Sequence, residues 1–391
     1  MTSMDQATTG WHQDLGRGAA GTALARVAAA RITGLPPRAT APWIRAMTES
    51  PVTASASASL FYGAPAVAFV LHTAAHPAYT AMLAALDEHI NDLTALKLAA
   101  AHKRIDRGKL TRPSEYDLIS GLTGLGLYHL VRHGSAASGM TAAVLRYLVK
   151  LAAPVCRHSE SLPGWWSGTG PAGAPGPAWP GGHLNLGMAH GGAGVLALLS
   201  GAMRVGIQVE GHAKAVRELC AAFDRYRQGS SASPWWPATI SLREHRQGTT
   251  SQERQARPSW CYGTPGQARA QQLAGLALGD LERVRAAERA LAGCVLDRQV
   301  TGLLTDASLC HGWAGVVQAL RRAASDALSP QPLQAALREA RRGMEDHLAR
   351  AGPPASVGLL EGTSGTQLAQ NDLPRTGGEP PCWDACLLLT L

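Results

Sequence analysis

Residues 308–317 read Ser-Leu-Cys-His-Gly-Trp-Ala-Gly-Val-Val, and this stretch contains the pattern that decides the fold. Its centre is a Gly-x-x-Gly motif followed by an apolar segment. The motif recurs along the whole chain, with alanine in the last position of the second copy. The seven copies are Gly18–Gly21, Gly63–Ala66, Gly121–Gly124, Gly191–Gly194, Gly263–Gly266, Gly312–Gly315 and Gly362–Gly365. A motif repeated from end to end predicts a fold built from structural repeats.

The segments between the glycine motifs have helical patterns. Residues 191–199 are apolar nearly all round, which is typical of a buried helix. Residues 331–351 place Leu and Met at helical spacing among charged residues, as in a helix with one exposed face. Each repeat is therefore expected to hold a buried inner helix, beginning at its glycines, and an exposed outer helix. Strand patterns are weak, so the predicted fold class is all-α.

The spacing of the repeats favours a closed arrangement. The first glycines are 45, 58, 70, 72, 49 and 50 residues apart, whereas open solenoids keep a more even period. The terminal copies also resemble the others rather than polar caps. We therefore expect an α/α barrel that forms a single domain over residues 1–391, with all inner helices beginning at the same mouth.

Composition and charge exclude several classes of protein. The chain has 391 residues, of which 46% are hydrophobic, enough for a full core rather than a disordered chain. No apolar run approaches the ~18 residues of a membrane span and no signal peptide is visible, so we expect a cytoplasmic protein. The net charge of +8 favours an acidic partner, but the basic residues are scattered, so no nucleic-acid partner is expected.

Two Gly/Pro/Ser-rich segments, 163–182 and 230–237, interrupt the helical pattern and hold five of the ten tryptophans. These tryptophans either pack the loops onto the domain or form a peptide-binding wall beside the mouth. Near the C-terminus, Cys382 and Cys386 form a C-x-x-x-C pair, for which we expect a core position rather than a second metal site.

Cys261, Cys310 and His311 directly precede two successive glycine motifs. Closure of the barrel is expected to bring the residues that precede each glycine motif by the same number of positions to one mouth of the barrel. Two thiolates and one imidazole suit Zn²⁺ and leave a fourth tetrahedral position open. Because two anionic ligands neutralise the metal charge, a substrate thiol bound there remains an electron-rich thiolate, which favours thiol activation over carbonyl polarisation. The alternative is that both cysteines are ordinary core residues.

Four further residues near the motifs are candidates for catalysis. His190 precedes a glycine pair, and its unperturbed pKa of ~6.5 suits proton transfer. Asp117 either orients His190 or the substrate, or lies at the start of a helix. Arg257 and Tyr262, close to Cys261, are placed to stabilise negative charge on a carbonyl oxygen.

Taken together, these motifs resemble those of the lanthionine synthetase C-like proteins, the lantibiotic cyclases, over nearly the whole chain. The motifs that carry the resemblance are Tyr116-Asp117 with Gly121, Ala189-His190-Gly191, Trp260-Cys261-Tyr262-Gly263, Cys310-His311-Gly312 and Gly362-x-x-Gly365. The resemblance implies an α,α-toroid of two concentric seven-helix layers. Residue by residue, it implies zinc ligands at Cys261, Cys310 and His311, and further active-site positions at His190, Asp117, Arg257 and Tyr262.

The activity that the resemblance implies is zinc-dependent formation of thioether rings. A peptide Cys thiol would add to dehydroalanine or dehydrobutyrine in a ribosomally made precursor, giving lanthionine or methyllanthionine. A separate dehydratase would supply the dehydrated peptide, and peripheral association with such a biosynthetic complex is compatible with the sequence. The charge of +8 would suit an acidic leader segment of the precursor.

Two other functions stay open at this point. The same zinc site would also suit addition of a free thiol such as glutathione to a dehydrated peptide, which raises the peptide mass, whereas ring closure leaves it unchanged. A non-catalytic peptide-binding scaffold would need neither zinc nor His190. The chain also departs from the family pattern at Pro258-Ser259, an uncommon pair that is expected to shift Arg257.

Overall fold

The computed structural model describes residues 11–390 except 134–138, 158, 175 and 372–381. Sixteen α-helices lie in these ranges, so the fold is mostly helical, as predicted. None of the described helices combines the length and the apolar character that crossing a lipid bilayer requires.

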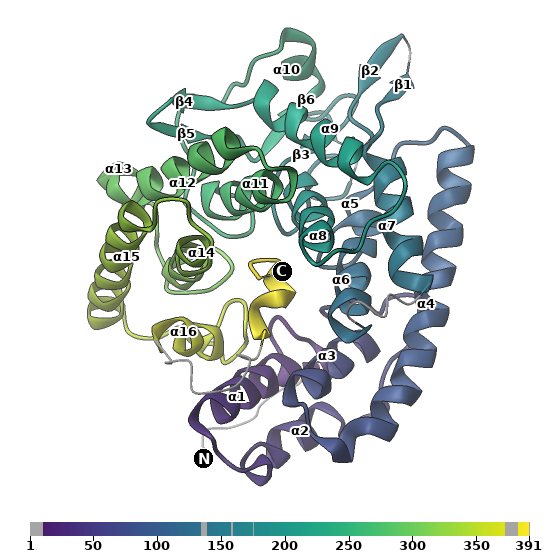
Figure 1. Cartoon of the computed structure of the whole chain (residues 1–391), viewed down its shortest axis with the longest axis vertical. Coiled ribbons are helices and arrows are strands. Elements are labelled where there is room, and N and C mark those ends of the chain that lie inside the picture. Colours follow the sequence, from purple (N-terminus) through teal and green to yellow (C-terminus); the bar gives the residue numbers. More distant parts are fainter. Residues whose placement is uncertain (1–10, 134–138, 158, 175, 372–381, 391) are drawn as a thin grey trace.

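Seven helices form a central ring, shown in Figure 1. They are α1 (Ala19–Thr33), α3 (Ala64–Ala74), α6 (Leu122–His133), α8 (Gly192–Arg204), α11 (Thr264–Leu278), α14 (Trp313–Ser325) and α16 (Thr363–Gln370). Each of these inner helices contacts the next one along the chain, and α16 contacts α1, which closes the ring. The inner helices are largely buried; in α11, for example, every residue from Thr264 to Gly275 is buried.

The remaining helices lie outside this ring or in its connections. The outer helices are α2 (Ala41–Met47), α4 (Thr80–Asp106), α7 (Gly139–Ala152), α9 (His212–Arg225), α12 (Leu281–Leu296) and α15 (Pro330–Ala351). Short helices are α5 (Pro113–Tyr116), α10 (Leu242–Gln247) and α13 (Arg298–Thr301), with 3-10 turns η1 (Trp11–Gln13), η2 (Pro37–Ala39), η3 (Pro77–Tyr79) and η4 (Trp383–Leu387). Outer helices such as α15 bury one face only, with Leu333, Ala336, Ala340 and Met344 inward.

Every inner helix begins directly after the first glycine of a repeat, because the chain folds back tightly there. A Cβ atom on the second glycine would collide with the carbonyl oxygen of the residue six positions earlier, as between Gly266 and Trp260 or between Gly315 and Leu309. The same collision recurs in the other repeats that have the second glycine. The degenerate repeat with Ala66 differs, because its first glycine, Gly63, has a left-handed φ of 75°.

Six short strands lie among the described residues, and none of them was expected from the sequence. They are β1 (Val155–Arg157), β2 (Glu160–Leu162), β3 (His183–Asn185), β4 (Gln228–Ser230), β5 (Ser233–Trp235) and β6 (Thr239–Ser241). They form three antiparallel pairs, β1–β2, β3–β6 and β4–β5. Strands of three residues are too short to show an alternating pattern, which explains the omission. The pair β3–β6 joins the residues just after the two segments that were expected to be irregular loops, and β5 lies inside the second of these segments.

The C-terminal turn η4 lies at the centre of the ring (Figure 1). Its Asp384 is fully buried and accepts hydrogen bonds from Gln318 and Arg322 on α14. The indole Nε1 of Trp260 donates to the carbonyl oxygen of Leu387 at 2.9 Å. This turn therefore braces the segment that carries Cys261. Cys386 is buried, as predicted for the core, whereas Cys382 is exposed, which corrects the prediction for that residue.

Candidate metal centre

The two residues before the first glycine of each repeat line one cavity of 570 Å³ at the mouth of the ring. We call it the mouth cavity. The position two before the glycine holds Gly16, Phe61, Ile119, Ala189, Cys261, Cys310 and Leu360, and the position directly before it holds Arg17, Tyr62, Ser120, His190, Tyr262, His311 and Glu361. All seven repeats thus contribute, which confirms the expected convergence of matching offsets.

Backbone hydrogen bonds between neighbouring repeats fix the rim of this cavity. The amide of Ala189 donates to the carbonyl of Cys261 at 3.2 Å, and the amide of Cys261 donates to Cys310 at 3.2 Å. The series continues from Cys310 to Leu360 and from Leu360 to Gly16, both at 2.8 Å. The side chains at these positions are therefore placed by main-chain contacts, independently of what the side chains are.

The thiols of Cys261 and Cys310 lie next to each other and share a hydrogen bond. The hydrogen bond with Cys310 lowers the pKa of Cys261 to about 7; burial opposes this shift, and Ser259 and the charge of Arg257 support it. That same hydrogen bond and burial raise the pKa of Cys310. The site thus favours one thiolate readily and a second one only with a compensating positive charge, which is the electrostatic situation that a divalent cation satisfies.

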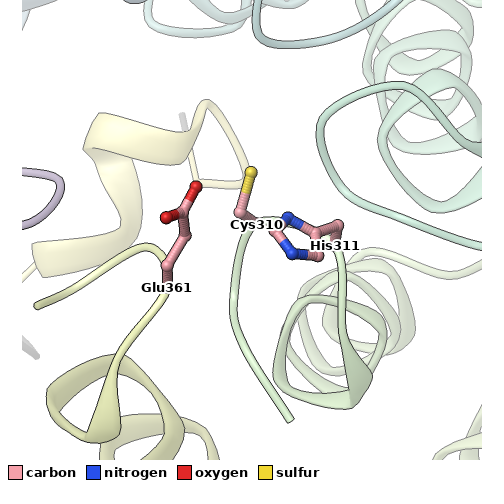
Figure 2. Close-up of side chains that lie close together, drawn as sticks. All are labelled: Cys310, His311 and Glu361. Carbon is pink, nitrogen blue, oxygen red and sulfur yellow. The ribbon is translucent and has the colours of Figure 1, made fainter. Parts of the chain in front are cut away.

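Cys310, His311 and Glu361 each place one ligand atom within 4.8 Å of those of the other two, as Figure 2 shows. Cys261 lies outside this three-residue cluster and adjoins it through Cys310. His311 also lies 3.3 Å from the carboxylate of Asp306 through its Nε2 atom. These residues could hold a metal ion, because thiolate, imidazole and carboxylate are all ligands of such sites.

His190 and Asp117 form a second functional group beside the thiols. The Nδ1 atom of His190 lies 2.5 Å from Oδ2 of Asp117. The other oxygen of Asp117 accepts from the amides of Ser120 and Gly121 at 2.7 and 2.9 Å, so the carboxylate also caps the turn before α6. Asp117 is only 2% exposed and does not line the cavity. Asp117 thus bonds His190 directly and lies between the end of α5 and the turn that leads into α6.

The charge state of His190 follows from two opposing effects. Burial lowers the pKa of its imidazole, whereas the hydrogen bond and the charge of Asp117 raise it, and the net pKa is raised. Because Nδ1 is engaged by Asp117, Nε2 is the nitrogen available for proton transfer.

Tyr262 and Arg257 also line the mouth cavity. The ring of Tyr262 stacks on that of His190 with centroids 6.0 Å apart. Burial raises the pKa of Tyr262 to about 12, so its phenol stays protonated and can donate a hydrogen bond. The Pro258-Ser259 pair does not remove Arg257 from the site, since this side chain still faces the cavity.

The sequence analysis missed Arg17 and Glu361. The Nη2 atom of Arg17 donates to Oε1 of Glu361 at 3.0 Å, and both side chains are partly open to solvent in the cavity. The signal was present, because both residues directly precede a glycine motif as His190 and His311 do.

The tryptophan-rich segments pack onto the domain instead of forming a wall of the mouth cavity. Trp165, Trp166, Trp235 and Trp236 are each at most 8% exposed and none of them lines that cavity. Trp165 donates to the carbonyl of Asn185 at 3.1 Å, and so anchors its segment to β3.

Comparisons with known proteins agree with this geometry. The model of the family described as "Lanthionine synthetase C-like protein" matches residues 10–388. The chain is 25% identical over 256 residues to the nisin biosynthesis protein NisC of Lactococcus lactis subsp. lactis, a match over 65% of this chain that spans 59% of that protein's length. The solved structure of a nisin cyclase resembles this fold with a TM-score of 0.79 at 21% identity, covering 98% of this chain and 93% of that one.

Proposed function

The chain belongs to the lanthionine synthetase C-like family, and from this premise we propose that it is a zinc-dependent lanthipeptide cyclase. Its substrate would be a ribosomally made peptide in which a separate dehydratase has formed dehydroalanine or dehydrobutyrine. The observation that carries the proposal is that the thiols of Cys261 and Cys310 and the imidazoles of His311 and His190 line one cavity, with buried Asp117 bonded to His190. We also assign the closed ring to the α,α-toroid architecture and treat residues 1–391 as one domain.

Cys261, Cys310 and His311 would hold the zinc ion, and Glu361 is placed to complete the set when no substrate thiol is present. These ligand types fit zinc, because two thiolates and one imidazole occupy three of its four tetrahedral positions and leave one for a further ligand. When bound, zinc would keep the substrate cysteine as a thiolate, which is the nucleophilic form. Arg17 pairs with Glu361 and so provides a partner for the carboxylate when the substrate thiol takes its place.

His190 would take up the proton that the substrate thiol loses on becoming a thiolate, and would then transfer a proton to complete the addition. Attack of the peptide sulfur on the β-carbon of the dehydro residue forms the C–S bond and leaves negative charge on the α-carbon and the carbonyl oxygen. Protonated His190 would deliver its Nε2 proton to the α-carbon, and Asp117 would hold the ring in the required orientation.

Tyr262 and Arg257 would stabilise the charge that develops on the carbonyl oxygen. Tyr262 lies against His190 and keeps its phenolic proton, while Arg257 supplies a positive charge in the same cavity. Donors that already face the place where charge develops lower the barrier without having to reorganise.

Ring formation can be tested on a dehydrated peptide that contains one cysteine. After incubation with the zinc-loaded protein, the account predicts an unchanged peptide mass and loss of the thiol that iodoacetamide would alkylate. A mass increase with added glutathione, without ring closure, would instead show free-thiol addition. Binding without any covalent change would show the scaffold function, and either outcome would overturn the cyclase proposal.

A further inference from the structure

A second cavity, of 640 Å³, lies between the α4–α5 connection, the β1–β2 hairpin and α10, and it shares no lining residue with the mouth cavity. Four basic side chains line it, namely Lys109, Arg112, Arg157 and Arg246, together with one acidic side chain, Glu160. The lining therefore carries a net charge of +3. We call it the basic cavity.

Most of this positive charge is uncompensated. Arg246 pairs with Glu160. Lys109, Arg112 and Arg157 are exposed and form no ion pair with any residue that the structure describes. Because three unpaired cations line the same cavity, an anionic occupant lowers the electrostatic free energy of the site.

The arrangement of the cations indicates what kind of anion fits. The four basic side chains come from three separate segments of the chain, which favours an extended occupant with several charges over a single small anion. Leu110, Leu162 and Leu242 supply apolar lining between them. Among the described lining residues there is no aromatic side chain on which a nucleic-acid base could stack.

We propose that the basic cavity binds an acidic segment of a peptide, one with Asp or Glu side chains around an apolar residue. The identity of this partner rests on the proposed function, in which the peptide is the substrate and the segment lies outside the part that forms rings. Charge complementarity of this kind increases the association rate and selects the partner.

The position of the cavity suits such a role. Gly181 lines the basic cavity and His190, nine residues further along the chain, lines the mouth cavity. An extended chain of nine residues spans at most about 30 Å, so the two cavities are no further apart than that along this connection. A peptide anchored by its acidic segment would therefore hold its cysteines at high effective concentration near the mouth.

The test is fluorescence anisotropy with a labelled twelve-residue peptide that alternates Asp or Glu with Leu, compared with the same peptide carrying Asn and Gln. The wild-type protein is expected to bind the acidic peptide at least about tenfold more tightly than the amide peptide. A double variant with Arg112→Glu and Arg157→Glu is expected to lose this preference. The matched control, with Arg338→Glu and Arg350→Glu on the exposed face of α15, changes the net charge equally and is expected to keep it.

Three other results would overturn the proposal that the basic cavity binds an acidic peptide segment. Equal binding of both peptides, or equal loss in the double variant and in the matched control, would show that only the overall charge matters. Displacement of the acidic peptide by micromolar inorganic phosphate would show a phosphate site instead. Circular dichroism of both variants checks that they fold. Because this binding needs neither zinc nor dehydration, it can fail while wild-type ring formation succeeds, and the reverse also holds.

Discussion

The mouth cavity and the basic cavity have similar volumes, 570 and 640 Å³, but they are built in different ways. In the mouth cavity, Arg17 and Arg257 balance Asp14 and Glu361, so its formal charge is zero with the histidines neutral. The basic cavity has a net charge of +3. The first cavity is lined mainly by residues in phase with the repeat, and the second by residues from the connections between repeats.

This difference indicates a division of roles. Proton transfer and metal binding need side chains placed to within a fraction of an ångström, and the backbone bonds around the mouth supply that placement. Attraction of a charged segment needs only the right sign of charge on accessible side chains. Changes in the mouth cavity should therefore affect the chemical step, and changes in the basic cavity should affect binding alone.

The largest expected effect is that of His190→Ala on the chemical step. Loss of the proton donor should lower the rate of ring closure by about 10² to 10⁴, the usual range for a general acid or base. Single-turnover mass spectrometry after thiol alkylation measures this rate. Acidic-peptide binding should be unchanged, and a parallel loss of both would show that the two cavities are not separate in function.

Asp117→Asn should have a smaller effect with a characteristic pH dependence. In the wild type, the hydrogen bond and charge of Asp117 outweigh burial and raise the pKa of His190. Asparagine removes the negative charge. Because its oxygen would be held by the amides of Ser120 and Gly121, its NH2 group would face Nδ1 in place of the acceptor, so the pKa of His190 should fall. The limb of the pH–rate profile on which activity declines as the imidazolium loses its proton should then move to lower pH. An unshifted limb with a merely reduced rate would contradict the positioning role of Asp117.

Gly266→Ala tests the tight backbone contact between Gly266 and Trp260 beneath the mouth cavity. The added Cβ would collide with the carbonyl oxygen of Trp260, which cannot move away as a flexible side chain could. The free energy of unfolding should fall by about 1–3 kcal/mol. The matched control is Gly139→Ala at the start of α7, where a Cβ meets nothing within 4 Å and stability should be kept. Equal denaturation midpoints for the two variants would contradict the packing argument.

The repeated Gly-x-x-Gly motif explains which features could be predicted from the sequence. The inner helices, the convergence of Cys261, Cys310 and His190 and the packing of Cys386 all follow from glycine phasing and apolar pattern. Applied to every repeat, the same rule would also have found Arg17. The basic cavity could not be predicted, because its side chains meet through three-residue strands, loops and the short helix α10, which carry no periodic signal. Nor does the sequence around Cys156 indicate that this residue lies exposed on β1.

Glu361→Gln should weaken zinc binding moderately. If the carboxylate completes the ligand set at rest, its replacement by a neutral amide should lower zinc affinity by about tenfold, as measured by competition with a chromogenic chelator. Glu339→Gln provides the control, since Glu339 is likewise paired with an arginine, Arg342, but on the exposed face of α15. Equal zinc affinity in both variants would remove Glu361 from the ligand set.

The smallest expected effect is that of salt. Raising the ionic strength should weaken binding of a substrate with an acidic segment a few-fold by screening the exposed cations, while the rate of ring closure at saturation should stay the same. Steady-state kinetics at two salt concentrations separates the two quantities. A fall in the saturated rate with unchanged binding would reverse the roles assigned to the two cavities.

The zinc content per chain of three proteins would show whether the mouth cavity is a zinc site. Its expected ligands are Cys261, Cys310 and His311. Elemental analysis should find one zinc in the wild type, one in Cys156→Ala, whose thiol is exposed elsewhere, and little in Cys310→Ala. Folded wild-type protein that contains no zinc and takes up none when it is added, or Cys310→Ala protein that keeps a full equivalent, would contradict the account.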